Sequence, residues 1–114
     1  MTENQLPLPS SFVALFVPPG RTRPTESREH LLARHELCED LAQTLVERAR
    51  LLLVQLGVAE EDVIERIRAG LADEESGLDP REAHWVACRL AELLGWPMPP
   101  GAPETGGETE DDPA

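Results

Sequence analysis

The longest regular pattern of apolar residues lies between Thr25 and Leu56. Positions in this stretch repeat with alternating spacings of four and three, which places them on one face of an α-helix and is the spacing of coiled coils. The repeating positions are Leu31, His35, Cys38, Ala42, Leu45, Ala49, Leu52 and Leu56. Neither Pro nor Gly interrupts the stretch before Gly57, a residue typical of helix ends. The pattern predicts one long helix over residues 25–56.

The last turns of this helix are apolar on more than one side. Leu51 and Val54 point away from the main stripe, and a helix that is apolar all round is buried on more than one side. We therefore expect its C-terminal half to contact two neighbours or a second chain, most simply as a homodimer. The candidate residues for self-association are Leu45, Leu51, Leu52, Val54 and Leu56.

Two shorter helices are predicted over residues 59–72 and 79–94. In the first, an apolar face follows three acids, which favour a helix N-terminus; the face consists of Val63, Ile64, Ile67 and Leu71. The second opens with Asp79, Pro80 and Glu82, the arrangement of a capping box with Pro in the first turn, and it stops before Gly95. The predicted fold is an all-α helical bundle over residues 25–96.

Residues 1–24 form an N-terminal segment with one short apolar element and a linker rich in Pro and Arg. One interpretation is a docking element for a protein partner, in which apolar anchors precede a short basic stretch. Its residues would be Phe12, Leu15, Phe16, Arg21 and Arg23. The other interpretation, which we prefer, is that the segment folds back and covers the apolar end of the long helix.

Composition narrows the range of functions. The 114-residue chain has a formal net charge of −12, and an acidic body repels the phosphates of nucleic acids. All ten basic residues are Arg, which excludes a Walker A loop and Schiff-base chemistry because both need Lys. The tail from Pro97 to Ala114 combines Pro, Gly and acids with few apolar residues, so we expect it to be disordered.

Two pairs of His and Cys at helical spacing raise the question of a metal site. His35 and Cys38 lie on the long helix, and His84 and Cys88 lie on the last helix. Together they could supply the four ligands of a tetrahedral zinc site. However, His84 and Cys88 lie opposite Val86 on their helix, so the pairs converge only if that helix turns its small face inward. We prefer a buried structural Cys38, and we expect no metal or cofactor.

The small face of the last helix allows two interpretations of its own. His84, Cys88, Ala91 and Gly95 follow 4-3-4 spacing, so this face is either a second contact surface or a weakly polar solvent face. Trp96, just after the helix, is expected to pack over the edge of the core.

Three segments of the chain resemble a known family. They are PSSFVALFVPPGRTRPTESRE, HELCEDLA and DEESGLDPREAHWVACRLAELLGW, and the resemblance covers roughly residues 5–96. The family consists of small, uncharacterised proteobacterial proteins that often carry the label "ATPase with chaperone activity". This chain lacks the Walker A motif and the Lys that an ATPase needs. The resemblance therefore implies only a protein that works with another protein, and no functional residue is carried over.

The chain is therefore expected to be a non-enzymatic interaction protein, such as an adaptor, regulator or accessory chaperone. Two widely spaced cysteines and the lack of a visible signal peptide or membrane span favour the cytoplasm. An alternative is an acidic mimic that occupies the basic groove of a DNA- or RNA-binding protein. A second alternative is the metal-binding helical protein described above.

Overall fold

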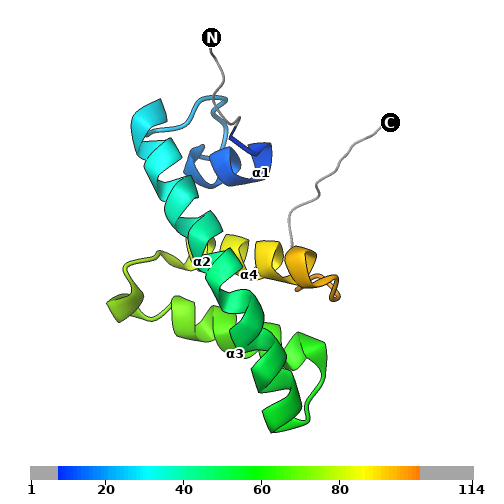
Figure 1. The fold of residues 1–114 in the computed structure, drawn as a ribbon. Coiled ribbons are helices and arrows are strands. Elements are labelled where there is room, and N and C mark those ends of the chain that lie inside the picture. Colours follow the sequence, from blue (N-terminus) through cyan, green and yellow to red (C-terminus); the bar gives the residue numbers. More distant parts are fainter. Residues whose placement is uncertain (1–7, 101–114) are drawn as a thin grey trace.

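The computed structural model describes residues 8–100, and within this range every regular element is helical. In chain order the elements are α1 (Ser10–Val13), the 3₁₀ turn η1 (Ala14–Phe16), α2 (Arg28–Leu56), α3 (Glu60–Leu71), the 3₁₀ turn η2 (Glu74–Ser76) and α4 (Pro80–Leu94) (Figure 1). The predicted all-α bundle with one long and two shorter helices is confirmed. The sequence also predicts a disordered tail from Pro97 onward, and the residues of this tail after Pro100 lie outside the described range.

Helix α2 begins three residues later than predicted. Ser27 is its N-cap, because the Ser27 hydroxyl accepts a hydrogen bond from the backbone N–H of His30 (3.1 Å). Thr25 is held outside the helix, since its N–H and its hydroxyl both donate to the Phe16 carbonyl. At the other end Gly57 adopts the left-handed conformation (φ 64°) and stops the helix where predicted.

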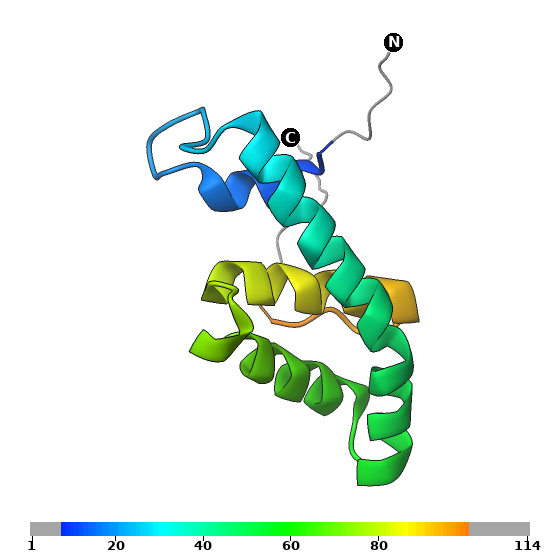
Figure 2. The same ribbon diagram turned by 60° about the vertical axis from the view of Figure 1, so that its left-hand side comes forward.

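Helix α4 is the central element of the fold. Its predicted capping box is confirmed: the Asp79 carboxylate accepts from the N–H of Glu82 (3.0 Å), and the Glu82 carboxylate accepts from the N–H of Asp79 (3.1 Å). In Figure 2, α3 lies beneath α4, and α2 runs diagonally across α4 and past one end of α3. Residues on several sides of α4 are consequently buried, namely Ala83, Trp85, Val86, Ala87, Cys88, Leu90 and Ala91.

Two apolar clusters meet on α4. The first joins it to α3 and to the C-terminal half of α2, and it contains Ala49, Val63, Ile64, Ile67, Ala87, Leu90 and Ala91. The second joins it to α1 and to the N-terminal half of α2, and it contains Phe12, Cys38, Ala42, Leu78, Trp85 and Val86. Trp96 packs at the edge of the first cluster, as expected from the sequence. The small face of α4 is divided: Ala91 packs in the cluster shared with α3 and Cys88 is buried, whereas His84 is half-buried and Gly95 is exposed.

The N-terminal segment folds back onto the bundle, but not at the end predicted. Elements α1 and η1 lie beside the N-terminal half of α2, away from the C-terminal end of that helix (Figures 1 and 2). Neither Ser10 nor Ser11 caps α1, since Pro9 occupies the N-cap position. The Ser11 hydroxyl instead accepts a hydrogen bond from the indole N–H of Trp85 (3.0 Å), which ties α1 to α4.

Candidate protein-interaction surface

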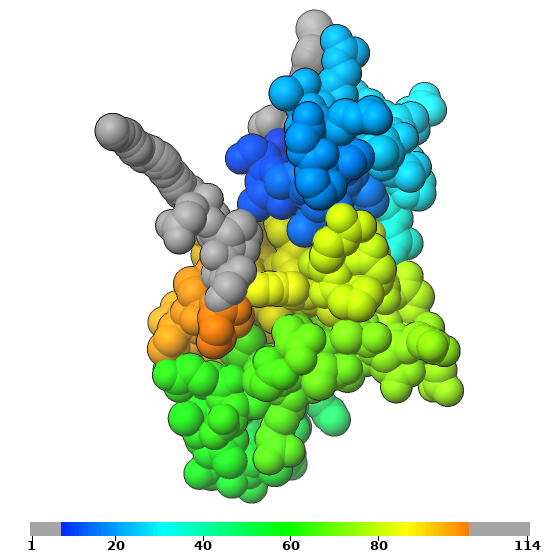
Figure 3. Space-filling model, turned by 180° about the vertical axis from the view of Figure 1, so that it is seen from behind, coloured from blue at the N-terminus to red at the C-terminus, as the bar shows by residue number. Residues whose placement is uncertain are grey.

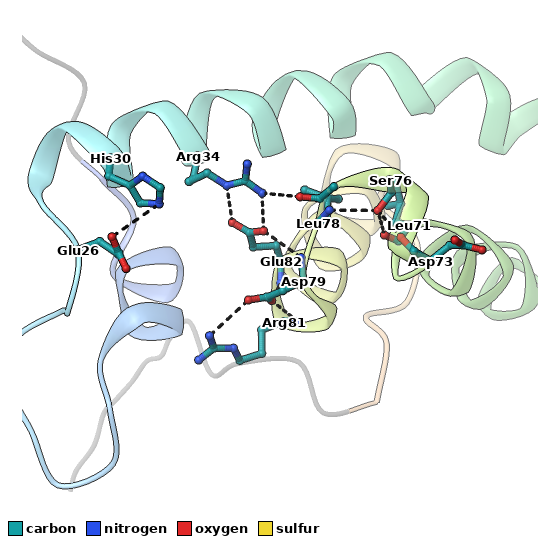
Figure 4. Close-up of polar contacts among 11 residues, drawn as sticks. Glu26, His30, Arg34, Leu71, Asp73, Ser76, Leu78, Asp79, Arg81 and Glu82 are labelled. Carbon is teal, nitrogen blue, oxygen red and sulfur yellow. Dashed lines mark hydrogen bonds and ion pairs between the residues drawn. The ribbon is translucent and has the colours of Figure 1, made fainter.

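Two ion pairs join α2 to α4 along the face of α2 that points inward. The guanidinium of Arg34 on α2 donates to both carboxylate oxygens of Glu82 on α4 (2.8 and 2.6 Å) and also to the carbonyl of Gly77 (Figure 4). In the second pair the roles are exchanged, because Arg89 on α4 donates to both carboxylate oxygens of Glu39 on α2 (2.9 and 3.0 Å). Two-pronged pairs of this kind fix orientation as well as distance.

The electrostatics of these pairs follow from their geometry. Hydrogen bonding to Glu82 raises the pKa of Arg34, and the Arg89 guanidinium lowers the pKa of the Glu39 carboxyl. Sequence analysis missed both pairs, although a signal was present. Each charged residue lies beside an apolar stripe and not on the opposite face of its helix. An Arg or Glu beside the apolar stripe of one helix, with a residue of opposite charge beside the stripe of the other, could have indicated these two ion pairs.

With the inner face fixed, the opposite side of α2 is its outer face. Near the C-terminus of the helix this face carries Leu51 and Val54, whose side chains are 51% and 80% exposed. They are three positions apart and therefore adjacent on the helix surface. Their neighbours on this face, Arg48 and Gln55, are exposed too. We call the surface formed by Glu47, Arg48, Leu51, Val54 and Gln55 the outer patch.

The other residues predicted for self-association lie elsewhere. Leu45 and Leu52 are half-buried and pack against the first cluster, and Leu56 is 42% exposed at the helix end. The C-terminal half of α2 does contact two neighbours, α3 and α4, as predicted. Leu51 and Val54, which prompted that prediction, nevertheless stay exposed. The surface on the other side of the molecule is formed by the N-terminal segment, α3 and α4 (Figure 3).

The N-terminal candidates for partner binding are divided between core and surface. Phe12 is fully buried in the second cluster. Its ring makes edge contacts with the rings of Trp85 and His35, with 5.2 and 5.4 Å between the ring centroids. Leu15 and Phe16 are half-buried against the same cluster, whereas Arg21 and Arg23 are exposed. Phe12 is therefore part of the core and is not presented to a partner in this conformation.

The four metal candidates do not converge. Cys38 is buried in the second cluster, and the ring of His35 packs against the rings of both Phe12 and Trp85. The ring Nε2 of His84 and the Sγ of Cys88 lie 3.5 Å apart, within one helix. In residues 8–100 no three side chains of His, Cys, Asp or Glu come together as a metal site would require. Burial raises the pKa of the Cys38 thiol to about 12 and that of the Cys88 thiol to about 11.

An open hollow lies between α1 and the start of α2. Its lining combines apolar side chains with one acid and one Arg, and it consists of Leu8, Val13, Pro24, Glu26, Arg28 and Leu31. Glu26 also approaches His30, with 3.9 Å between the carboxylate and the ring nitrogen (Figure 4). Both side chains are about half exposed, and an exposed pair of this kind adds little to stability.

Comparison with known proteins returned no match, whether against protein-family models, curated proteins or solved structures. Within the described part of the chain, no helix has both the length and the apolar content that a membrane crossing requires.

Proposed function

We propose that this chain is a non-enzymatic protein-interaction module that binds through the outer patch of α2. The observation that carries the proposal is the exposure of Val54 next to Leu51 on one turn of a long, well-anchored helix. Single apolar residues are common on protein surfaces, and contiguous exposed apolar side chains rimmed by polar residues favour a contact site. Burying such side chains contributes about 1.5–3 kcal/mol each when burial is complete.

The setting of the patch supports this role. A rigid helix that presents residues at i and i+3 can lie in a groove or against another helix without reordering its backbone. The anchors of α2 lie on its opposite face, so a partner can cover the outer patch without breaking the fold. An adaptor, regulator or accessory chaperone in the cytoplasm is consistent with this arrangement, and the two buried free thiols fit a reducing compartment.

The test is a capture experiment with three full-length chains immobilised in parallel and exposed to native cell lysate. They are the wild type, Val54→Glu, and Ala33→Glu as a control that adds the same charge to an exposed position of the same helix. Circular dichroism first establishes that all three fold equally. The proposal predicts that captured proteins, identified by mass spectrometry, are lost only with Val54→Glu.

The same set of captured proteins from all three chains would contradict the proposal. Repeating the capture at high salt separates it from the acidic-mimic hypothesis. Binding through apolar side chains persists in salt, whereas binding through a negative surface alone weakens steeply.

A further inference from the structure

We infer that α2 and α4 form a docking groove for an amphipathic helix of a partner protein, and that the N-terminal segment covers this groove as a displaceable strap. The strap comprises residues 8–25. The groove is the surface that the strap covers, on the N-terminal half of α2, on α4 and on the residue two positions before α4. It consists of Cys38, Ala42, Leu78, Trp85 and Val86. The groove lies apart from the outer patch, so this inference goes beyond the proposed function.

The strap shows which chemistry the groove accepts. Phe12, Leu15 and Phe16 follow i, i+3 and i+4 spacing and pack in or against the second cluster, with Phe12 fully buried. The Phe12 ring contacts the ring of Trp85, and the indole N–H of Trp85 donates to the Ser11 hydroxyl (3.0 Å). Apolar anchors at this spacing, laid against two helices, are the helix-in-groove mode of recognition. The groove therefore fits an amphipathic helix with two aromatic residues one turn apart.

Few bonds hold the strap to the rest of the molecule. Helix α1 has four residues, and a helix of this length is not stable alone. Among the described residues, a single hydrogen bond joins residues 8–25 to α2, α3 or α4, and it is the bond from Trp85 to Ser11. Displacement of the strap thus breaks this bond and the packing of its apolar side chains.

The strap and the body can separate without losing their own internal bonds. Thr25 donates its N–H and its hydroxyl to the Phe16 carbonyl, so the strap is closed on itself and can turn as one unit about residues 26–27. The body keeps the first apolar cluster and both ion pairs between α2 and α4. Opening of the strap therefore exposes the groove on a body that remains assembled.

The strap does not fill the space beside the groove. A hollow of about 390 Å³ lies between it and the start of α2, and Val13 of the strap and Leu31 of α2 are among the residues that line this hollow. A partner helix with a larger apolar side chain in place of Val13 can fill the hollow. The strap of a second copy carries the same Val13 and would leave the hollow open. We therefore assign the groove to a helix of a different protein.

The covalent link of the strap determines how well such a helix must bind. A segment on a short flexible linker acts at an effective concentration in the millimolar range. A partner helix binds only the fraction of chains whose strap is open, and its apparent affinity is reduced by that fraction. The groove is consequently closed to weak ligands and accessible to a helix that fits better than the strap.

The first experiment measures the fluorescence anisotropy of a labelled peptide with the sequence of residues 8–17, titrated with full chain to millimolar concentration. Ser11→Ala in the chain loosens the strap, whereas the peptide keeps its own Ser11 for Trp85. The peptide should therefore bind the Ser11→Ala chain about fivefold more tightly than the wild type. Ser10→Ala, at an exposed position of α1, is the matched control and should bind like the wild type. A peptide that carries Phe12→Ala should bind none of the chains.

A reciprocal substitution tests the role of the hollow. A peptide that carries Val13→Leu should bind the wild-type chain about threefold more tightly than the parent peptide, because its larger side chain fills the hollow. The same substitution in the chain should hold the strap more firmly and weaken binding of the parent peptide about threefold. Circular dichroism verifies that each variant chain folds like the wild type.

A peptide that binds neither the wild-type nor the Ser11→Ala chain at millimolar concentration would overturn the inference, as would equal binding to both. Binding that is lost in Val54→Glu would transfer the peptide to the outer patch and overturn it too. If the Val13→Leu peptide binds no better than its parent, the hollow does not select a bulkier helix and the assignment to a different protein fails. A dimer of the chain that excess peptide returns to monomer would assign the groove to a second copy.

Discussion

Glu82 is the one charged residue that is buried in the described part of the chain. Its carboxylate accepts hydrogen bonds from Arg34 and from the N–H of Asp79. Glu82 therefore takes part both in the ion pair between α2 and α4 and in the capping box of α4. Removing it leaves the Arg34 guanidinium without its partner in a partly buried position.

Replacement of Glu82 by Ala should therefore lower the free energy of unfolding by about 2–3 kcal/mol. Urea unfolding followed by circular dichroism measures this change. Glu61→Ala is the matched control, because it removes an exposed acid and should change stability by no more than about 0.5 kcal/mol. Equal effects of the two substitutions would show that the pair does not anchor α2 to α4.

His35 makes stability depend on pH. Burial against Phe12 and Trp85 lowers the pKa of His35, Arg89 of α4 lowers it further, and Glu39 and Glu36 of α2 act in the opposite direction. In the unfolded chain the pKa of His is about 6.5, so the unfolded chain binds the proton more readily. The neutral ring stabilises the fold fully above that pH, and this stabilisation is lost as the pH falls from about 6.5 through the lowered pKa of His35 in the folded chain.

The chain should thus unfold at a lower urea concentration at pH 5.5 than at pH 7.5. His35→Gln should remove most of this difference, whereas His30→Gln, at an exposed position on the same helix, should retain it. A pH dependence that survives His35→Gln would assign the effect to another group.

The two cysteines should be inert in the folded protein. Because burial raises the thiol pKa values to about 12 and about 11, almost no thiolate is present at pH 7.5. A chromogenic thiol reagent should react with both cysteines only after urea is added. Rapid modification of the native chain would contradict the burial of Cys38 and Cys88 described above.

Among the elements, α1 is the one whose role the sequence left open. It contains only four helical residues, too few to be stable alone, so its position depends on Phe12 and on the hydrogen bond from Trp85 to Ser11. Phe12→Ala should destabilise the chain by about 3–4 kcal/mol and alter the near-ultraviolet circular dichroism of Trp85. Phe16→Ala, at a half-buried ring, should have a smaller effect. An unchanged stability in Phe12→Ala would instead favour a docking element.

The helices were predictable because their signals are local. The 4-3 spacing up to Leu56, the left-handed stop at Gly57 and the capping box at Asp79 all lie within a few residues of the boundary they determine. The start of α2 was misplaced because the hydrogen bonds of Thr25 to Phe16 close a loop nine residues long, which periodicity does not report. The burial of Phe12 depends on its contact with Trp85, which is distant in sequence, so local patterns could not predict it either.

The candidate site was only partly predictable for the same reason. The sequence indicated that Leu51 and Val54 leave the main stripe, which is a property of one helix. Whether another element covers them depends on where α3 and α4 pack, and that arrangement rests on contacts distant in sequence, such as the ion pairs of Arg34 with Glu82 and of Arg89 with Glu39.

At the scale of the whole molecule, α2 links two apolar clusters and presents one uncovered face. Its inner face is held by α1, α3 and α4, while Leu51 and Val54 of the outer patch stay exposed. Because the exposed residues that carry the patch are apolar, binding at it should persist as salt screens the net charge of −12.

The most direct test of the account is a nuclear magnetic resonance titration of the isotope-labelled full chain. Backbone amide signals are followed as fractions of native cell lysate are added in turn. The account predicts that shifts and line broadening concentrate in residues 47–62, at the end of α2 and the start of α3. Perturbations confined to the N-terminal segment, or absent from residues 47–62 with every addition, would contradict it.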